Sequence, residues 1–277
     1  MRIRISHQTR YSYDSPMLAV LQILRLTPRD SDGQHVLSWR LEPSAEGRLK
    51  PFEDAFGNLC HEFAADERVG QLALTVAGEV ETQDTAGIVR GTVERVPELV
   101  FLRETPLTAA DDAIRAFASA VEAQAARDPL GTLHAVLAAI HREIAFDTGP
   151  TNASTTAAEA FALRRGVCQD LTHIFIASAR YLGIPARYIS GYFHRADGVT
   201  DQDAGHAWVE AKVPGLGWVG FDPANGIGTT EAHVRVAAGL DYLGAAPVRG
   251  SRRGGGSETL DVRLRVDTRR SQVQSQS

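Results

Sequence analysis

Cysteine is scarce in this 277-residue chain, which holds only Cys60 and Cys168. Two thiols do not make the disulfide framework of a small secreted domain, so we expect both to be free. Basic residues are also in the minority, with 29 Lys and Arg against 34 Asp and Glu and a formal net charge of −5. No block of basic residues interleaved with aromatic residues occurs, and this argues against a nucleic-acid partner.

Long apolar runs are missing as well. The sequence has no uninterrupted apolar stretch of about 18 residues, and residues 1–5 lack the apolar segment and cleavage site of a secretory signal. We therefore expect no membrane partner and a cytoplasmic location, where reduction keeps thiols available as nucleophiles. Histidine and cysteine pairs at metal-ligand spacing are also absent from the sequence, so we expect neither a metal nor a cofactor.

The rest of the composition is that of a globular protein, with 43% hydrophobic and 23% charged residues. Apolar and polar side chains alternate through much of the first third, for instance Ile3 and Ile5 against Arg2 and Arg4, and this period of two predicts antiparallel strands. The predicted divisions are an N-terminal β-rich domain over 1–100, a catalytic core over 101–268 and a disordered tail over 269–277.

In the second domain the spacing of apolar residues changes to three and four, which predicts helices. Thr108 can cap a first helix that ends near Ala126. Further helices are predicted over 133–144, over 157–165 and from Cys168 to about Leu182. Strands are predicted over 186–193, 206–213, 218–222 and 259–266, with 249–256 as a basic, glycine-rich loop. The predicted fold class is therefore α+β.

Cys168 follows a glycine loop at the start of a predicted helix and lies outside the apolar stripe of that helix. Unpaired N–H groups and the positive end of the helix dipole favour the thiolate there, and the same N–H groups can bind an oxyanion. The alternative is a buried small hydrophobe, the commonest role of a free cysteine. Its position favours a nucleophilic role for Cys168, whereas Cys60 lies within a predicted strand and is interpreted as structural.

His206 begins a predicted strand in which it shares one face with Trp208, Glu210 and Lys212. The opposite face carries small apolar residues. We expect the apolar face to pack in the core and the His206 face to be the functional one. Trp208 can then wall the active site, although filling core space is an equally good interpretation of a tryptophan.

The loop after this strand decides whether Asp222 can reach His206. A four-residue loop would oppose Val213 to Trp218 and would put the histidine and the aspartate on opposite faces of the hairpin. A three-residue loop opposes Trp208 to Asp222 and lets the two side chains meet diagonally. The sequence permits the second register, and glycine at the end of the loop suits the bulge that such loops carry.

A thiol nucleophile needs a base beside it, and the base needs a third group that fixes its tautomer. Cys168, His206 and Asp222 supply these three parts, so we predict a catalytic triad. Gln169 and the loop before Gly166 are possible sources of a second oxyanion donor, and Trp208 is a possible pocket residue. Asp170 is interpreted as a carboxylate of the first helical turn with no catalytic role.

The residues around the triad resemble a known family. The strings Gly-Val-Cys-Gln-Asp-Leu-Thr-His at 166–173, Gly-Ile-Pro-Ala-Arg-Tyr at 183–188, Gly-His-Ala-Trp-Val-Glu at 205–210 and Phe-Asp-Pro at 221–223 are similar to the core of bacterial transglutaminase-like proteins. Residues 7–13, 26–29 and 54–58 are similar to the β-rich region that precedes that core. The resemblance implies a papain-like α+β fold with the triad on Cys168, His206 and Asp222.

We accordingly expect thiol-dependent hydrolysis of an amide, peptide or isopeptide bond, with a peptide or amide as substrate. The alternatives are transglutaminase-type transfer of the acyl group to an amine and a non-catalytic binding module on the same fold. Nothing in the sequence is typical of a calcium-binding loop, so the calcium dependence of animal transglutaminases is not implied. The substrate and the oligomeric state remain open at this stage.

Overall fold

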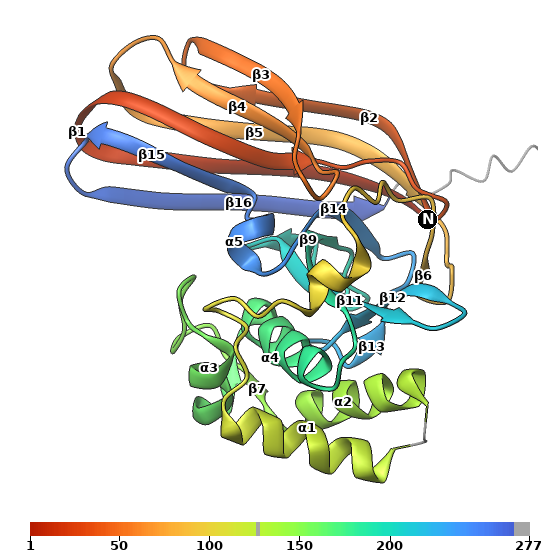
Figure 1. Ribbon diagram of the computed structural model, residues 1–277. Coiled ribbons are helices and arrows are strands. Elements are labelled where there is room, and N and C mark those ends of the chain that lie inside the picture. Colours follow the sequence, from red (N-terminus) through yellow and green to blue (C-terminus); the bar gives the residue numbers. More distant parts are fainter. Residues whose placement is uncertain (126–127, 269–277) are drawn as a thin grey trace, which may run out of the picture.

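The computed structural model describes residues 1–125 and 128–268, and the predicted tail at 269–277 lies outside them. Two antiparallel sheets lie beside each other, and helices cover the side of the smaller sheet that faces away from the larger one (Figure 1). One main core cluster contains side chains from all three layers, among them Ile3, Val209 and Ile174. The fold is thus mostly β, with its longer helices gathered in one layer.

The larger sheet is built around one long strand, β1 (Arg2–Thr27). Its first half alternates buried and exposed side chains, with Ile3 and Ile5 facing the core and Arg2 and Arg4 facing solvent, so the predicted period of two is confirmed here. The other strands of this sheet are β2 (Gln34–Pro43), β3 (Gly47–Glu53), β4 (Leu59–Ala65), β5 (Val69–Thr82), β10 (Asp201–Gln202), β15 (Val248–Gly254) and β16 (Glu258–Thr268).

The last two strands correct the prediction for the C-terminal part of the chain. Residues 249–256 were expected to form a loop, but most of them lie in β15, which pairs with the second half of β1. β16 pairs with the first half of β1, so the segment assigned to the catalytic core completes the N-terminal sheet. An alternating pattern identifies a strand without identifying its partner. The exposed arginines of β15 fit an edge strand, where charge discourages pairing with other chains.

The smaller sheet has the strand order β13, β12, β11, β9, β14, with β6 paired to β12. Its helical side is covered first by α4, which packs against β9 and β11, and the remaining long helices surround α4 (Figure 1). The strands are β6 (Ile88–Val89), β9 (Ala186–Phe193), β11 (His206–Val213), β12 (Gly217–Asp222), β13 (Ile227–Gly228) and β14 (His233–Gly239). The helices are α1 (Asp112–Gln124), α2 (Pro129–Glu143), α3 (Ala157–Leu163), α4 (Cys168–Tyr181), the short α5 (Tyr242–Ala245) and a 3-10 turn, η1 (Glu98–Leu102). A short parallel pair, β7 (Ala145–Phe146) with β8 (Arg165–Gly166), completes the described elements.

The start of α1 differs from the prediction. Asp111, not Thr108, is the N-cap, and its carboxylate accepts a hydrogen bond from the N–H of Ile114 at 2.9 Å. The Thr108 hydroxyl is buried and accepts a hydrogen bond from Arg180 at 2.8 Å. Both residues are good caps by type, so the choice between them depends on a tertiary contact that the local sequence does not contain.

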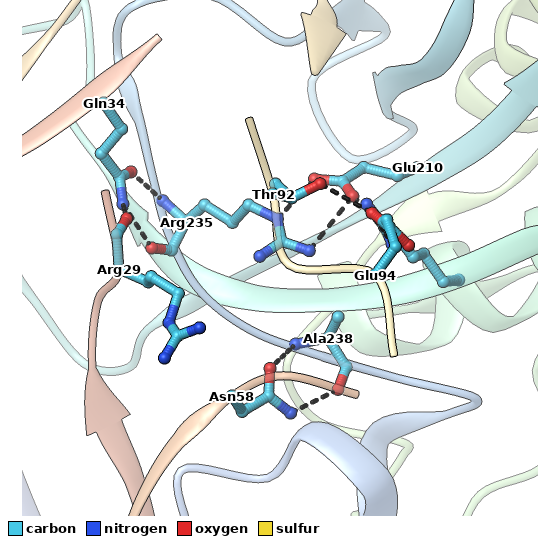
Figure 2. A network of polar contacts seen from close by, with 9 residues as sticks. Arg29, Gln34, Asn58, Thr92, Glu94, Glu210, Arg235 and Ala238 are labelled. Atoms are coloured by element: carbon cyan, nitrogen blue, oxygen red, sulfur yellow. Dashed lines mark hydrogen bonds and ion pairs between the residues drawn. The ribbon is translucent and has the colours of Figure 1, made fainter. Parts of the chain in front are cut away.

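The outer edge of β14 is held by two amide side chains from the N-terminal domain (Figure 2). Gln34 accepts from the N–H of Arg235 at 2.7 Å and donates to its carbonyl at 2.8 Å. Asn58 makes the same pair of bonds with Ala238, both at 2.8 Å. Each carboxamide therefore replaces one residue of a neighbouring strand, and together they satisfy the edge of the smaller sheet.

We expect Asn58→Leu to lower the free energy of unfolding by about 2–5 kcal/mol, because it leaves a buried N–H and a buried C=O of Ala238 unpaired. Chemical denaturation monitored by circular dichroism measures the change. Gln71→Leu, at an exposed position of the larger sheet, is the matched amide-to-leucine control and should stay within about 0.5 kcal/mol of the parent. Equal stabilities for the two variants would contradict a role of Asn58 in holding β14.

Candidate active site

Cys168 is the first residue of α4, and the chain before it is shaped to place it there. Arg164 ends α3 in the left-handed conformation with φ of 55°. Gly166 is buried against the side chain of Asp170, and a Cβ at Gly166 would lie 2.6 Å from its Oδ2. Asp170 in turn accepts hydrogen bonds from the N–H of Val167 at 2.8 Å and the Thr151 hydroxyl at 2.7 Å. As predicted, Asp170 braces the first turn of the helix.

The two cysteines lie in different surroundings. Cys168 is partly exposed at the helix start, whereas Cys60 is buried in β4. Burial and the nearby carboxylate of Asp54 raise the pKa of Cys60 to about 12. At neutral pH the Cys60 thiol is therefore almost fully protonated, which is the condition of an inert structural cysteine.

The hairpin of β11 and β12 has the register that lets the triad form. Val213 is opposite Gly217 and Lys212 is opposite Trp218, so the loop is the three-residue one. The same register continues to Val209 opposite Phe221 and puts Trp208 across from Asp222. The four-residue alternative, which would have separated the histidine from the aspartate, does not occur in this hairpin.

His206 lies between the nucleophile and the aspartate. Its Nε2 is 2.7 Å from Oδ2 of Asp222, which leaves Nδ1 as the ring nitrogen available to the hydrogen-bonded Cys168. Burial by itself would lower the pKa of His206, but the hydrogen bond and charge of Asp222, together with those of Cys168, raise it to about 10. The structure thus brings together all three residues of the predicted triad, and its electrostatics favour an imidazolium beside the thiol.

Asp222 is fully buried and is surrounded by hydrogen-bond donors. Besides His206, its Oδ2 accepts from Asn225 Nδ2 at 2.6 Å and from His233 Nε2 at 3.2 Å. Its Oδ1 accepts from the N–H groups of Ala224 and Asn225, both at 3.1 Å. Burial would raise the pKa of Asp222, but His206 and His233 hold it far below its usual range. The carboxylate is therefore ionised and fixed in orientation.

Sequence reasoning missed His233 and Asn225. Asn225 follows Asp222 by three residues in the turn after β12, so the proximity of Asn225 has a local signal. His233 has none, because it begins β14 and reaches the site only through the pairing of β14 with β9, in which it lies opposite Phe193. A long-range strand pairing of this kind leaves no mark on the spacing of the residues concerned.

The predicted functional face of β11 is covered in the structure. Trp208 is only 2% exposed, and its ring stacks on His206 and meets His233 edge to face. With Glu210 and His233 it lines a small, partly open pocket of about 60 Å³. Glu210 forms buried ion pairs with Arg187 at 2.6 Å and with Arg235 at 2.8 Å. Figure 2 shows the pair with Arg235. Trp208 therefore packs against both imidazoles, and its role as a residue of the substrate pocket stays a prediction.

Gln169 lies in the first turn of α4, directly after Cys168. It is half-buried, and its Nε2 lies 3.5 Å from the carbonyl oxygen of Ala153, in the loop that precedes α3. The bond is long and weak. The side-chain amide of Gln169 is thus held only loosely beside the nucleophile.

His206, Asp222 and His233 also form a cluster in which the three ligand-type atoms lie within 4.8 Å of one another. The hydrogen bonds indicate whether these atoms act as metal ligands or as hydrogen-bond partners of one another. The backbone N–H of Thr230 donates to Nδ1 of His233 at 3.1 Å, so the neutral ring carries its proton on Nε2. A metal ligand needs a free lone pair at that atom. The cluster is therefore organised as two donors on one carboxylate.

Two family descriptions match the chain in succession. The bacterial transglutaminase-like N-terminal region matches residues 3–81, and the transglutaminase-like superfamily core matches residues 115–223. The core match includes Cys168, His206 and Asp222. The chain belongs to the transglutaminase-like superfamily and carries the N-terminal region of its bacterial members.

Individual relatives match the chain over nearly its whole length. The uncharacterised protein ML0607 of Mycobacterium leprae is 29% identical over 279 residues, which cover 96% of this chain and 98% of the relative. The uncharacterised protein Rv2569c of Mycobacterium tuberculosis is 28% identical over 274 residues, with coverages of 90% and 87%. The crystal structure of a candidate cysteine protease from Cytophaga hutchinsonii matches with a TM-score of 0.76 and 21% identity, and covers 97% of this chain and 90% of that one. The last similarity establishes a shared fold.

None of the helices within residues 1–125 and 128–268 is long and apolar enough to cross a membrane.

Proposed function

We propose that the protein is a cysteine hydrolase of the papain-like, triad-dependent type, which cleaves an amide, peptide or isopeptide bond through an acyl-enzyme on Cys168. One observation carries the proposal: His206 bonds to Asp222 through Nε2 at 2.7 Å, while Cys168 lies near enough to help raise the pKa of the same imidazole. A buried carboxylate, an imidazole and a partly exposed thiol in this order are the parts of nucleophilic acyl transfer.

In the proposed reaction Cys168 Sγ attacks the carbonyl carbon of the substrate, and the thiol proton resides on His206. The tetrahedral oxyanion accepts a hydrogen bond from the N–H of Cys168, which has no partner within the helix because it belongs to the first turn. Gln169 is the proposed second donor. The C–N bond then breaks as His206 gives its proton to the leaving amine, and a thioester remains on Cys168.

The second half of the reaction uses the same groups. His206 removes a proton from a water molecule, which attacks the thioester carbon, and the carboxylic acid leaves as Cys168 recovers its proton through His206. Asp222 holds the imidazole in the tautomer that both steps require. We place this reaction in the cytosol, where the two free cysteines would stay reduced.

We expect a glutamine-containing peptide incubated with the protein and an excess of a primary amine to yield mainly the free acid. Mass spectrometry separates the acid, which gains 1 Da, from the amine adduct, and the incubation contains a chelator because no calcium is required. The Cys168→Ala variant is the inactive control. A dominant amine adduct at modest amine concentration would make transglutaminase-type transfer the correct function and hydrolysis the wrong one.

A further inference from the structure

His233 is the second histidine that contacts the buried side chain of Asp222. It lies in β14, an edge strand of the smaller sheet. Its side chain is buried, and its Nε2 lies 3.2 Å from the same Oδ2 of Asp222 that accepts from His206. β14 is separated from β12 by two other strands. Asp222 is therefore contacted by a side chain from outside the hairpin of β11 and β12.

The orientation of His233 is fixed at both ring nitrogens. Thr230 N–H donates to Nδ1 at 3.1 Å, which leaves the proton on Nε2 and makes that atom a donor to Asp222. Phe193 and Trp208 pack on the ring with centroid distances of 4.7 and 5.2 Å. The ring is thus held in one position and one tautomer, as a second donor to Asp222 requires.

The N-terminal domain holds the strand that carries this histidine. Gln34 binds both backbone groups of Arg235, two residues after His233 (Figure 2). The hydroxyl of Thr82 donates to the carbonyl of Glu231, two residues before it, at 2.5 Å. Bonds on both sides of His233 thus connect the larger sheet to the position of its ring.

We propose that His233 is a positioning residue of the active site, which the N-terminal domain delivers on β14 to orient Asp222 toward His206. Asp222 Oδ2 accepts from three side chains, and the donor from His233 restricts the rotation of the carboxylate that would misalign the imidazole. The proposal rests on the proposed function, since it assigns His233 to the support of the proposed triad. It also gives the N-terminal domain a part in catalysis.

The test compares His233→Leu with His233→Gln. Leucine removes the donor, whereas glutamine brings an Nε2–H to about the same distance from the backbone, and both variants remove the acceptor for Thr230. We expect His233→Leu to lower kcat about 10- to 100-fold with KM changed less than about twofold, which is the loss of one hydrogen bond to a charged group. His233→Gln should recover most of kcat. Wild-type kcat in both variants, or an equal loss in both, would overturn the proposal.

The rate of Cys168 alkylation by iodoacetamide provides a readout that needs no substrate. It depends on the alignment of His206 with Asp222, so His233→Leu should react more slowly than the parent and His233→Gln close to the parent rate. If the parent hydrolyses nothing but this order holds, the proposed hydrolysis is wrong and the positioning role stands. If hydrolysis is found but the two variants react alike, His233 has only a packing role. Thermal melting of each variant identifies any that fail to fold.

Discussion

Asp222→Asn should lower kcat/KM by about 10⁴-fold, because asparagine cannot present an acceptor to His206 without creating a conflict elsewhere. With the amide nitrogen toward His206, the imidazole must accept there and carries its proton on the nitrogen that faces Cys168, where it cannot act as a base. With the amide reversed, the amide nitrogen faces the N–H groups of Ala224 and Asn225, which in the parent protein donate to Oδ1 of Asp222. Donors would then face donors. Either orientation disables the histidine or the turn that follows.

The control for this experiment is Asp241→Asn. Asp241 is also a buried carboxylate, and it caps α5 by accepting from the N–H of Gly244 at 3.0 Å. Asparagine is an equally good cap, so this variant should keep near-parent activity. A circular dichroism melt of both variants separates loss of function from loss of fold. Turnover within a few-fold of the parent in folded Asp222→Asn would exclude Asp222 as the orienting group.

The parts of this site that could be predicted from the sequence are those determined by neighbouring residues. A glycine loop followed by a helix start places Cys168 at an N-terminus, and the parity of a short hairpin limits Asp222 to two positions relative to His206. Each is a local rule with few alternatives. The sequence allowed two registers for this hairpin, and the structure has the one with the three-residue loop.

The parts that could not be predicted depend on contacts between distant segments. β16 pairs with β1 across nearly the whole chain, and β14 brings His233 to Asp222 only after the smaller sheet has assembled. The polar face of β11 also became buried, because Glu210 finds two arginine partners and Trp208 packs between the histidines. The pattern of residue types records that these side chains are polar or aromatic but does not record what covers them.

The N-terminal domain contacts the smaller sheet at several points. Its strands hold β14 through Gln34 and Asn58 and reach the smaller sheet again where His7 of β1 contacts the hydroxyl of Tyr192 at 3.1 Å. Burial lowers the pKa of His7 to about 4, so this contact is uncharged at neutral pH. The two sheets are therefore joined by neutral hydrogen bonds that salt does not screen, and we expect the active site to keep its geometry over a wide range of ionic strength.

The second large effect concerns the two thiols. At pH 7 iodoacetamide should modify Cys168 at least about 10³ times faster than Cys60. The Cys60 pKa of about 12 leaves a very small fraction of thiolate, and that thiol is 1% exposed. Cys168 is partly exposed. The imidazole of His206 lies beside it, and its pKa is raised to about 10, so it is protonated at pH 7. Peptide mass spectrometry after brief alkylation measures both rates in one sample.

The pH dependence of the same reaction tests the influence of His206 on Cys168. Because the pKa of His206 is raised above its ordinary 6.5 to about 10, the imidazolium persists between pH 7 and 9, and Cys168 should stay the faster-reacting thiol throughout that interval. The Cys60 rate should rise about tenfold for each pH unit, as expected of a thiol far below its pKa. In denaturant the two cysteines should react alike, and in His206→Ala the advantage of Cys168 should shrink to that of an ordinary exposed thiol. Equal rates in the folded parent protein, or a preference for Cys60, would remove Cys168 as the nucleophile and with it the proposed acyl-enzyme.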